Sequence, residues 1–308
     1  MEGYPLTIEN YDGYGGKGEL IPQTFYQPPE RIVATSEMTV DNLIFLGLED
    51  KIVGISDMTS KFHAPYDEIY ARLPRLNSFG SYPSREQIIA VQPDIIIGWG
   101  SLFEENAIGS VKEWHVRGIH TYVMKNTVPT RATGDRKVRY FLDDLENLSK
   151  IFHISEQTEP KIDELRKRLD RAEAWSNRIP EWERPTVMTV QYTYGNSYFG
   201  RTNTDMISDI IWLAGGRSVD GRFGNRQSIE FLLEKNPDII LLIDMSNQSS
   251  TWKTNAMEQN PILQNVKAVQ NKNFLVINFN AFYCGSFRTI DELERLQKLV
   301  KNNVKKDY

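Results

Sequence analysis

Aromatic side chains crowd ahead of an arginine in the second half of the chain. Tyr192, Tyr194, Tyr198 and Phe199 all lie shortly before Arg201. Aromatic rings gathered in one loop are typical of a surface that meets a flat or apolar ligand. A guanidinium forks onto two acceptors and keeps its charge when it loses water, so Arg201 could bind carboxylate, hydroxamate or catecholate oxygens. The alternative for Arg201 is an ordinary ion pair on the surface of its lobe.

More aromatic residues and arginines follow other strands that the sequence predicts. In a parallel α/β sheet the loops at the carboxyl ends of the strands face the crevice where ligands bind. The further candidates in such loops are Phe62, Tyr82, Trp99, Arg226, Tyr283 and Arg288. Trp99 and Tyr283 could instead be packed core residues, and arginine is common on any protein surface.

The composition and the motifs exclude several functions. The net charge is −5, which gives no general electrostatic support for binding nucleic acid. No apolar run approaches the ~20 residues that span a bilayer. The single Cys284 cannot form an internal disulfide, and the four histidines lack the spacing of a zinc site. The sequence also lacks the common nucleophile, P-loop and dinucleotide-binding motifs.

One segment of the sequence occurs twice. Residues 84–97 read S-R-E-Q-I-I-A-V-Q-P-D-I-I-I, and residues 228–241 read S-I-E-F-L-L-E-K-N-P-D-I-I-L. Each copy predicts a short helix that begins after a serine cap, has a glutamate in its first turn and cannot continue through the proline. The isoleucine and leucine run that follows is typical of a parallel strand buried on both faces. Two such copies predict two similar α/β lobes, and two lobes make a cleft for a ligand.

The remaining elements alternate around one long helical stretch. Residues 1–30 are rich in Gly, Tyr and Pro, and we expect an irregular lead-in there. An N-terminal lobe over residues 31–153 and a C-terminal lobe over residues 181–308 alternate strands and helices, which favours parallel sheets. Residues 154–180 carry an apolar stripe with charges between its members, which predicts a helix long enough to link the lobes.

Several motifs, taken in order, resemble one family. They are R-I-V-A-T-S-E from residue 31, L-G-L-E-D-K-I-V-G-I-S-D over 46–57, L-P-R-L-N-S-F-G over 73–80, the first repeat copy, W-L-A-G-G over 212–216, the second copy and N-P-I-L over 260–263. Together they resemble the substrate-binding proteins of ATP-driven importers of iron–siderophore complexes, haem and cobalamin. The resemblance implies an α/β fold of two Rossmann-like lobes with parallel sheets, joined by one long helix, with a ligand groove between the lobes.

The resemblance also implies roles for individual residues. Y-F-G-R at 198–201 is similar to a stretch of siderophore-binding members whose arginine contacts the iron-bound oxygens, although Phe199 stands where a tryptophan is common. Some relatives ligate iron with a tyrosine at the place of Tyr283. The family docks to its membrane permease through one glutamate on each lobe, and Glu86 and Glu230 hold those positions. The alternative for both glutamates is stabilisation of a helix terminus.

The function that these features predict is capture without catalysis. The resemblance implies a monomeric, extracytoplasmic protein that binds a ferric siderophore and delivers it to an ABC permease. It implies no intrinsic cofactor, since the iron complex is the cargo. Such a protein is free in the periplasm or held on the membrane by a lipid anchor outside this chain, and its signal segment is absent from this chain.

Two other functions stay open at the level of sequence. A haem or corrinoid carrier needs an axial ligand, for which Tyr283, His63 and Met58 are available. A chelatase-like enzyme or a glycosyl transferase would need carboxylates in the crevice. Glu37 and Asp57 lie near strand ends of the first lobe, but both also fit roles as helix-cap or turn residues.

Overall fold

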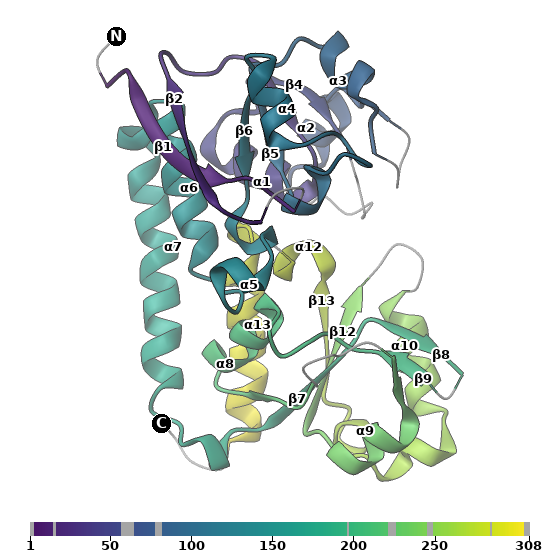
Figure 1. The fold of residues 1–308 in the computed structure, drawn as a ribbon. Helices are drawn as coiled ribbons and strands as arrows, with labels where there is room; N and C mark the ends of the chain where they lie inside the picture. Colours follow the sequence, from purple (N-terminus) through teal and green to yellow (C-terminus); the bar gives the residue numbers. More distant parts are fainter. Residues whose placement is uncertain are drawn as a thin grey trace. The chain divides into compact units, whose positions relative to one another are not determined.

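Two compact units make up the chain in the computed structural model (Figure 1). Unit 1 consists of Met1–Leu165 and Cys284–Phe287, and unit 2 consists of Arg166–Tyr283 and Arg288–Tyr308. The structure describes residues 3–14, 17–56, 65–77, 82–195, 197–220, 226–244, 249–283 and 285–304, with the side chain of Arg226 excepted.

Unit 1 is built on a four-stranded parallel sheet in the order β4-β3-β5-β6. The strands are β3 (Ile32–Ala34), β4 (Ile52–Ile55), β5 (Ile95–Gly98) and β6 (His120–Val123). The isoleucines of β5 are fully buried, which explains why this strand reads as a continuous apolar run. The helices of the unit are α1 (Glu37–Leu46), α2 (Asp67–Arg72), α3 (Arg85–Ala90), α4 (Val111–Val116), α5 (Thr130–Thr133) and α6 (Tyr140–Ile151).

Unit 2 contains a second four-stranded parallel sheet, in the order β10-β7-β12-β13. Its strands are β7 (Thr186–Val190), β10 (Arg217–Ser218), β12 (Ile239–Asp244) and β13 (Phe274–Asn278). A small antiparallel sheet is formed by β8 (Tyr192–Tyr194), β9 (Ser197–Phe199) and β11 (Arg226–Ser228). The helices are α8 (Met206–Leu213), α9 (Ile229–Lys235), α10 (Ser250–Glu258), α11 (Lys267–Gln270), α12 (Phe279–Phe282) and α13 (Phe287–Asn303).

The two parallel sheets have the same topology. In each, the first strand along the chain lies between the second and the third, and the fourth follows the third. The repeat copies correspond to α3 with β5 and α9 with β12, so each copy supplies the third strand of its own sheet. The predicted fold class, two α/β lobes with parallel sheets, is confirmed.

The aspartate of the repeat makes the same contact in both units. The Asp94 carboxylate accepts hydrogen bonds from the backbone nitrogens of Glu30 (2.8 Å) and Arg31 (2.9 Å), just before β3. The Asp238 carboxylate accepts from the backbone nitrogen (2.8 Å) and the hydroxyl (2.7 Å) of Thr186, where β7 begins. Each carboxylate therefore ties the third strand to the first and satisfies backbone N–H groups at the amino end of the sheet.

The expected irregular lead-in is instead a hairpin. β1 (Leu6–Tyr11) and β2 (Leu20–Phe25) pair antiparallel along their whole length. The buried side-chain amides of Asn10 and Gln23 each donate to and accept from the backbone of β6. Four hydrogen bonds thus cover the open edge of the unit 1 sheet, where exposed backbone groups would invite wrong pairing. The sequence did not predict this hairpin, because the segment is rich in Gly and Pro.

The predicted long helix is α7 (Ser155–Ser176), which begins in unit 1 and ends in unit 2. Its 22 residues span ~33 Å at the rise of an α-helix. The apolar stripe that predicted it is buried, from Ile162 through Leu169 to Trp175. Neither α7 nor any other helix in the described part of the chain is long and apolar enough to cross a membrane.

A buried arginine holds the end of α7. Arg184 is 4% exposed, and its guanidinium donates to the carbonyl oxygens of Ser176 (2.7 Å), Ile179 (3.2 Å) and Trp212 (2.9 Å). Its Cζ also lies 3.6 Å from the ring centroid of Trp212. The last carbonyl groups of a helix have no partner within the helix, so a fixed cation there both satisfies them and complements the helix dipole.

Replacing this arginine tests whether it anchors the helix end. Arg184→Met should lower the free energy of unfolding by about 3 kcal/mol, because several buried carbonyl groups lose a charged donor. Urea unfolding followed by circular dichroism measures the loss. Arg178→Met is the matched control, since Arg178 is exposed in the same segment. Similar losses for the two substitutions would contradict the anchoring role.

Candidate ligand-binding site

Arg201 is fixed at the carboxyl end of the unit 2 sheet. It follows β9, and its backbone nitrogen donates to the hydroxyl of Thr189 in β7 (2.7 Å). Its Nη1 donates to Oε1 of Gln191 (3.0 Å), and its Nη2 lies 2.7 Å from Oδ2 of Asp205. The side chains of Arg201 and Asp205 are 18% and 12% exposed. This largely desolvated ion pair holds the guanidinium in one orientation and compensates its charge locally.

Aromatic rings lie beside this guanidinium. Cζ of Arg201 is 5.6 Å from the ring centroids of both Phe282 and Tyr283. Tyr283 in turn stacks on Phe279, with centroids 5.0 Å apart. The three rings follow β13, so they also lie at the carboxyl end of the sheet. The guanidinium has five N–H groups, and its contacts with Gln191 and Asp205 engage one terminal nitrogen each, so the partly exposed cation keeps donor capacity for a ligand.

A buried carboxylate lies behind Arg201. Asp220, which follows β10, accepts hydrogen bonds from the nitrogen (3.2 Å) and the hydroxyl (2.9 Å) of Thr189. Burial raises the pKa of Asp220 to about 7, although hydrogen bonds from Thr189 and Ser218 and the charge of Arg201 oppose the rise. The Thr189 hydroxyl donates to Asp220 and accepts from the Arg201 nitrogen. The Thr189 hydroxyl therefore links the Asp220 carboxylate to the backbone of Arg201.

The hairpin of β8 and β9 sorts the neighbouring aromatic residues onto two faces. Tyr192, Tyr194 and Phe199 contact one another, with ring centroids between 6.1 and 6.4 Å apart. We call these three residues the aromatic cluster. Tyr198 is only 4% exposed and packs in the core of unit 2. Successive residues of a strand point to opposite faces, so the structure separates Tyr198 from the three rings with which it was grouped by sequence.

Two candidates in unit 1 have contrasting environments. Trp99 follows β5 and is 7% exposed, which matches the core role that the sequence left open. Tyr82 precedes α3 and is 52% exposed. Phe62 lies outside the described residues, as do Met58 and His63, which were considered as haem ligands. A role in ligand binding for Trp99, Tyr82 and Phe62 stays a prediction.

The arginines other than Arg201 are less defined. Arg226 belongs to β11, where its backbone pairs with that of Phe199, and its side chain lies outside the described part of the chain. Arg288 is partly buried near the start of α13 and already has interactions of its own. Their predicted contacts with a ligand stay predictions.

The described residues contain no group of three or more His, Cys, Asp or Glu side chains that could hold a metal ion. Coordination of iron by Tyr283 stays a prediction. It would require the siderophore to supply the other donor atoms. Of the two carboxylates considered for catalysis, Glu37 is 1% exposed in the first turn of α1, beside the Ser36 cap. Asp57 lies outside the described residues.

The glutamates of the repeat occupy matching positions at helix starts. Glu86 and Glu230 are both exposed in the first turns of α3 and α9. The backbone nitrogen of Glu86 and the Ser84 hydroxyl lower the pKa of the Glu86 carboxyl. The Ser228 hydroxyl and the backbone nitrogen of Glu230 do the same for the pKa of Glu230. Each unit therefore presents a carboxylate that stays charged at neutral pH and is oriented by its own helix start.

Sequence reasoning missed the residues that hold Arg201 in place. Asp205 lies four residues after Arg201, and this spacing was the available signal for an ion pair. Gln191 lies in the loop after β7, but a single glutamine there carries no signal of its own. Asp220 follows β10, which is only two residues long and has no recognisable strand pattern.

The fold and this arginine site can be compared with known proteins. The periplasmic binding protein family matches residues 32–281, which is most of the chain. The chain belongs to the periplasmic binding protein family. No curated protein matches it.

Solved structures share the fold of this periplasmic binding protein. A periplasmic binding protein from Veillonella parvula has a TM-score of 0.82 and 22% identity, over 97% of this chain and 92% of its own. An Fe3+-hydroxamate transport protein from Saccharomonospora viridis has a TM-score of 0.72 and 22% identity, over 96% and 99%. A haem-binding protein from Pseudomonas aeruginosa has a TM-score of 0.70 and 21% identity, over 90% and 94%. At these identities the likeness shows the fold alone.

The buried carboxylate behind Arg201 should titrate near neutral pH. In unfolded chains an aspartate has a pKa of about 3.9, so stability from this group is fully present below about pH 4 and is lost as pH rises through about 7. We expect a carboxyl carbon NMR signal with a midpoint near pH 7 that is absent in Asp220→Asn. Asp144 of unit 1, whose pKa burial raises to about 8, should give a separate signal that this substitution leaves in place. Titration of Asp220 below pH 5 would contradict the assignment.

Proposed function

We propose that this periplasmic binding protein captures a ferric siderophore outside the cytoplasm and delivers it to an ABC permease. The observation that carries the proposal is the Arg201 guanidinium, held by Asp205 and Gln191 beside the rings of Phe282 and Tyr283. A fixed cation with spare donors suits the metal-bound oxygens of a chelate. The rings beside it and the aromatic cluster suit the apolar body of such a ligand.

The charge balance favours a neutral chelate. Among the described side chains of this site Arg201 is the cation, and Oδ2 of Asp205 lies 2.7 Å from its Nη2 and compensates its charge. A ferric trihydroxamate is neutral, whereas a ferric triscatecholate carries a multiple negative charge. Bringing an uncompensated anion into a largely desolvated site is costly, because the charge loses water without gaining a full partner. The site therefore favours hydroxamate oxygens, which use hydrogen bonds rather than net charge.

The ligands named for the structural neighbours include a ferric hydroxamate, the class proposed here. One structural neighbour is an Fe3+-hydroxamate transport protein, another is a haem-binding protein, and a third from Vibrio cholerae binds vitamin B12. Transport on behalf of a membrane permease is common to proteins of this kind. In this proposal the protein has no intrinsic cofactor, and haem or a corrinoid is the alternative cargo.

Titration with chelates of different charge tests the proposal. Quenching of tryptophan fluorescence should saturate with a neutral ferric trihydroxamate, and much higher concentrations of a ferric triscatecholate should be needed. Arg201→Ala should weaken hydroxamate binding about 10- to 100-fold, the value of lost hydrogen bonds to a charged donor. Arg217→Ala is the matched control, since Arg217 begins β10 at the other end of the sheet.

Two other outcomes would contradict capture of a ferric siderophore. A Soret band that appears on haem addition and is lost in Tyr283→Ala, without hydroxamate binding, would select haem as the cargo. Absence of saturable binding by any ferric chelate, haem or corrinoid would refute capture of this ligand class.

Exchange of the repeat glutamates tests delivery separately from capture. Glu86→Arg combined with Glu230→Arg should abolish uptake in cells that carry the cognate permease, because a cation now faces the arginines that the family resemblance places on the permease. Affinity for the chelate should be unchanged, since both side chains are exposed helix-start residues. Glu234→Arg, at the far end of α9, is the control and should transport normally. Normal uptake by the double variant would show that these glutamates only stabilise their helices.

A further inference from the structure

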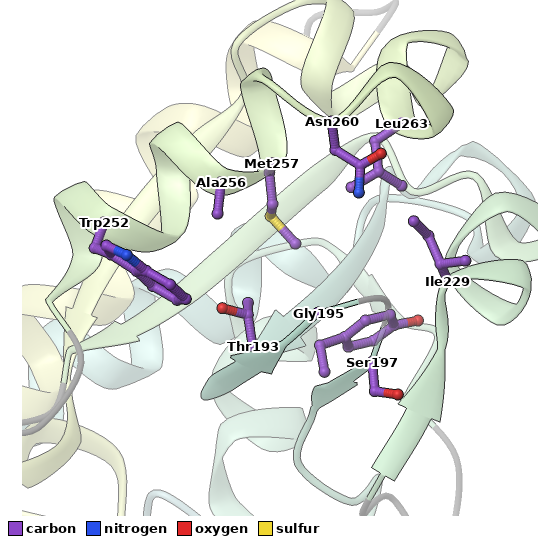
Figure 2. Close-up of a pocket in the computed structure, with 10 residues that line it drawn as sticks. Thr193, Gly195, Ser197, Ile229, Trp252, Ala256, Met257, Asn260 and Leu263 are labelled. Atoms are coloured by element: carbon purple, nitrogen blue, oxygen red, sulfur yellow. The ribbon is translucent and has the colours of Figure 1, made fainter.

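A pocket of about 170 Å³ lies in unit 2, on the side of the β8–β9 hairpin to which Tyr198 points. The hairpin, α9, α10 and the turn of 3-10 helix at Pro261–Asn265 form its walls (Figure 2). The aromatic cluster belongs to the opposite face of the same hairpin, because Tyr198 alternates with Phe199 along β9. The lining of the pocket also shares no residue with the Arg201 site.

The lining of this pocket is uncharged and mostly apolar. Ile229, Met257 and Leu263 are buried residues of the unit 2 core and form its inner wall. Trp252 is half exposed and forms its rim. An apolar cavity of roughly 150 Å³ is enough to hold a molecule of the size of benzene. The size and the lining therefore fit a single ring or a body of similar volume.

Two residues of the lining, Tyr198 and Asn260, carry hydrogen-bond donors. The hydroxyl of Tyr198 is buried and has no partner among the described residues. Burial, followed by the charges of Asp220 and Glu230, raises the pKa of this hydroxyl, so it stays protonated. Oδ1 of Asn260 already accepts from the backbone nitrogen of Ile262 (3.0 Å), and Figure 2 shows the amide nitrogen of Asn260 turned into the pocket. A buried donor without an acceptor is unfavourable, so a ligand that brings an acceptor within reach of either donor gains a hydrogen bond.

We propose that this pocket binds a small neutral molecule with a ring-sized apolar body and one hydrogen-bond acceptor, such as an aromatic ketone or amide. The uncharged lining and the nearby carboxylates of Asp220 and Glu230 disfavour an anion. This proposal does not depend on whether the Arg201 site binds a ferric siderophore.

Methyl NMR of the methionines in the full chain provides the test. Acetophenone is the probe, ethylbenzene lacks the acceptor, and benzoate carries a charge. The Met257 methyl signal, assigned from Met257→Leu, should shift saturably with acetophenone, while that of Met38 in unit 1 stays in place. Acetophenone should bind about fivefold more tightly than ethylbenzene, the usual value of one hydrogen bond, and benzoate more weakly than either.

Substitutions in the lining separate the parts of the proposal. Tyr198→Phe should reduce the preference for acetophenone over ethylbenzene, because only the Asn260 amide then remains as a donor, with Tyr26→Phe on the exposed surface as the unchanged control. Ala256→Leu should abolish the shift by filling the pocket from a partly exposed position. An unmoved Met257 signal in the unsubstituted protein would overturn the proposal. So would an equal shift in Ala256→Leu, or a preference for benzoate.

Discussion

In each unit one carboxylate joins the two central strands of the parallel sheet. Asp94 and Asp238 lie at the start of the third strand of their sheets and accept hydrogen bonds from the backbone at the start of the first. Because the two central strands are tied at their amino ends, their register is fixed and their carboxyl ends come to the same level. Loops can then vary at the carboxyl edge without disturbing the sheet, which is where α/β proteins place their ligands.

Arg201 uses this edge in a particular way. A buried ion pair contributes little to stability, since the cost of removing two charges from water nearly cancels their attraction. What Asp205 and Gln191 give is a single orientation of the guanidinium beside Phe282 and Tyr283. A pre-oriented donor spends less entropy when a ligand arrives. The same pairing compensates the charge of the guanidinium, which is why we propose a neutral ligand for this site.

The sequence predicted the framework better than the site. Period and repeat are properties of long segments, so the duplicated α3–β5 and α9–β12 units, the parallel strands and α7 were visible in the residues alone. The N-terminal hairpin was not, because Asn10 and Gln23 stabilise it through contacts with β6, far along the chain. Tyr198 was grouped with its neighbours because adjacency in sequence conceals the alternation of a strand that is only three residues long.

The residues around Arg201 show the same limit. Arg201 itself was singled out by its aromatic neighbours, whereas Gln191 and Asp220 come from loops after different strands and meet it only through the order of the sheet. A sequence pattern reports local spacing, but the charge of a binding site depends on which loops the topology brings together. From the sequence, the three candidate arginines would favour an anionic chelate, and it is the Asp205 contact that favours a neutral one.

The most direct test is a crystal structure of the protein with a neutral ferric trihydroxamate, with the iron located by its anomalous scattering. We expect the iron beside Arg201, with hydroxamate oxygens within about 3 Å of the guanidinium nitrogens and the chelate body against the aromatic rings. An iron position away from the carboxyl edge of the unit 2 sheet, with Arg201 still bound only to Asp205 and Gln191, would contradict capture at this site.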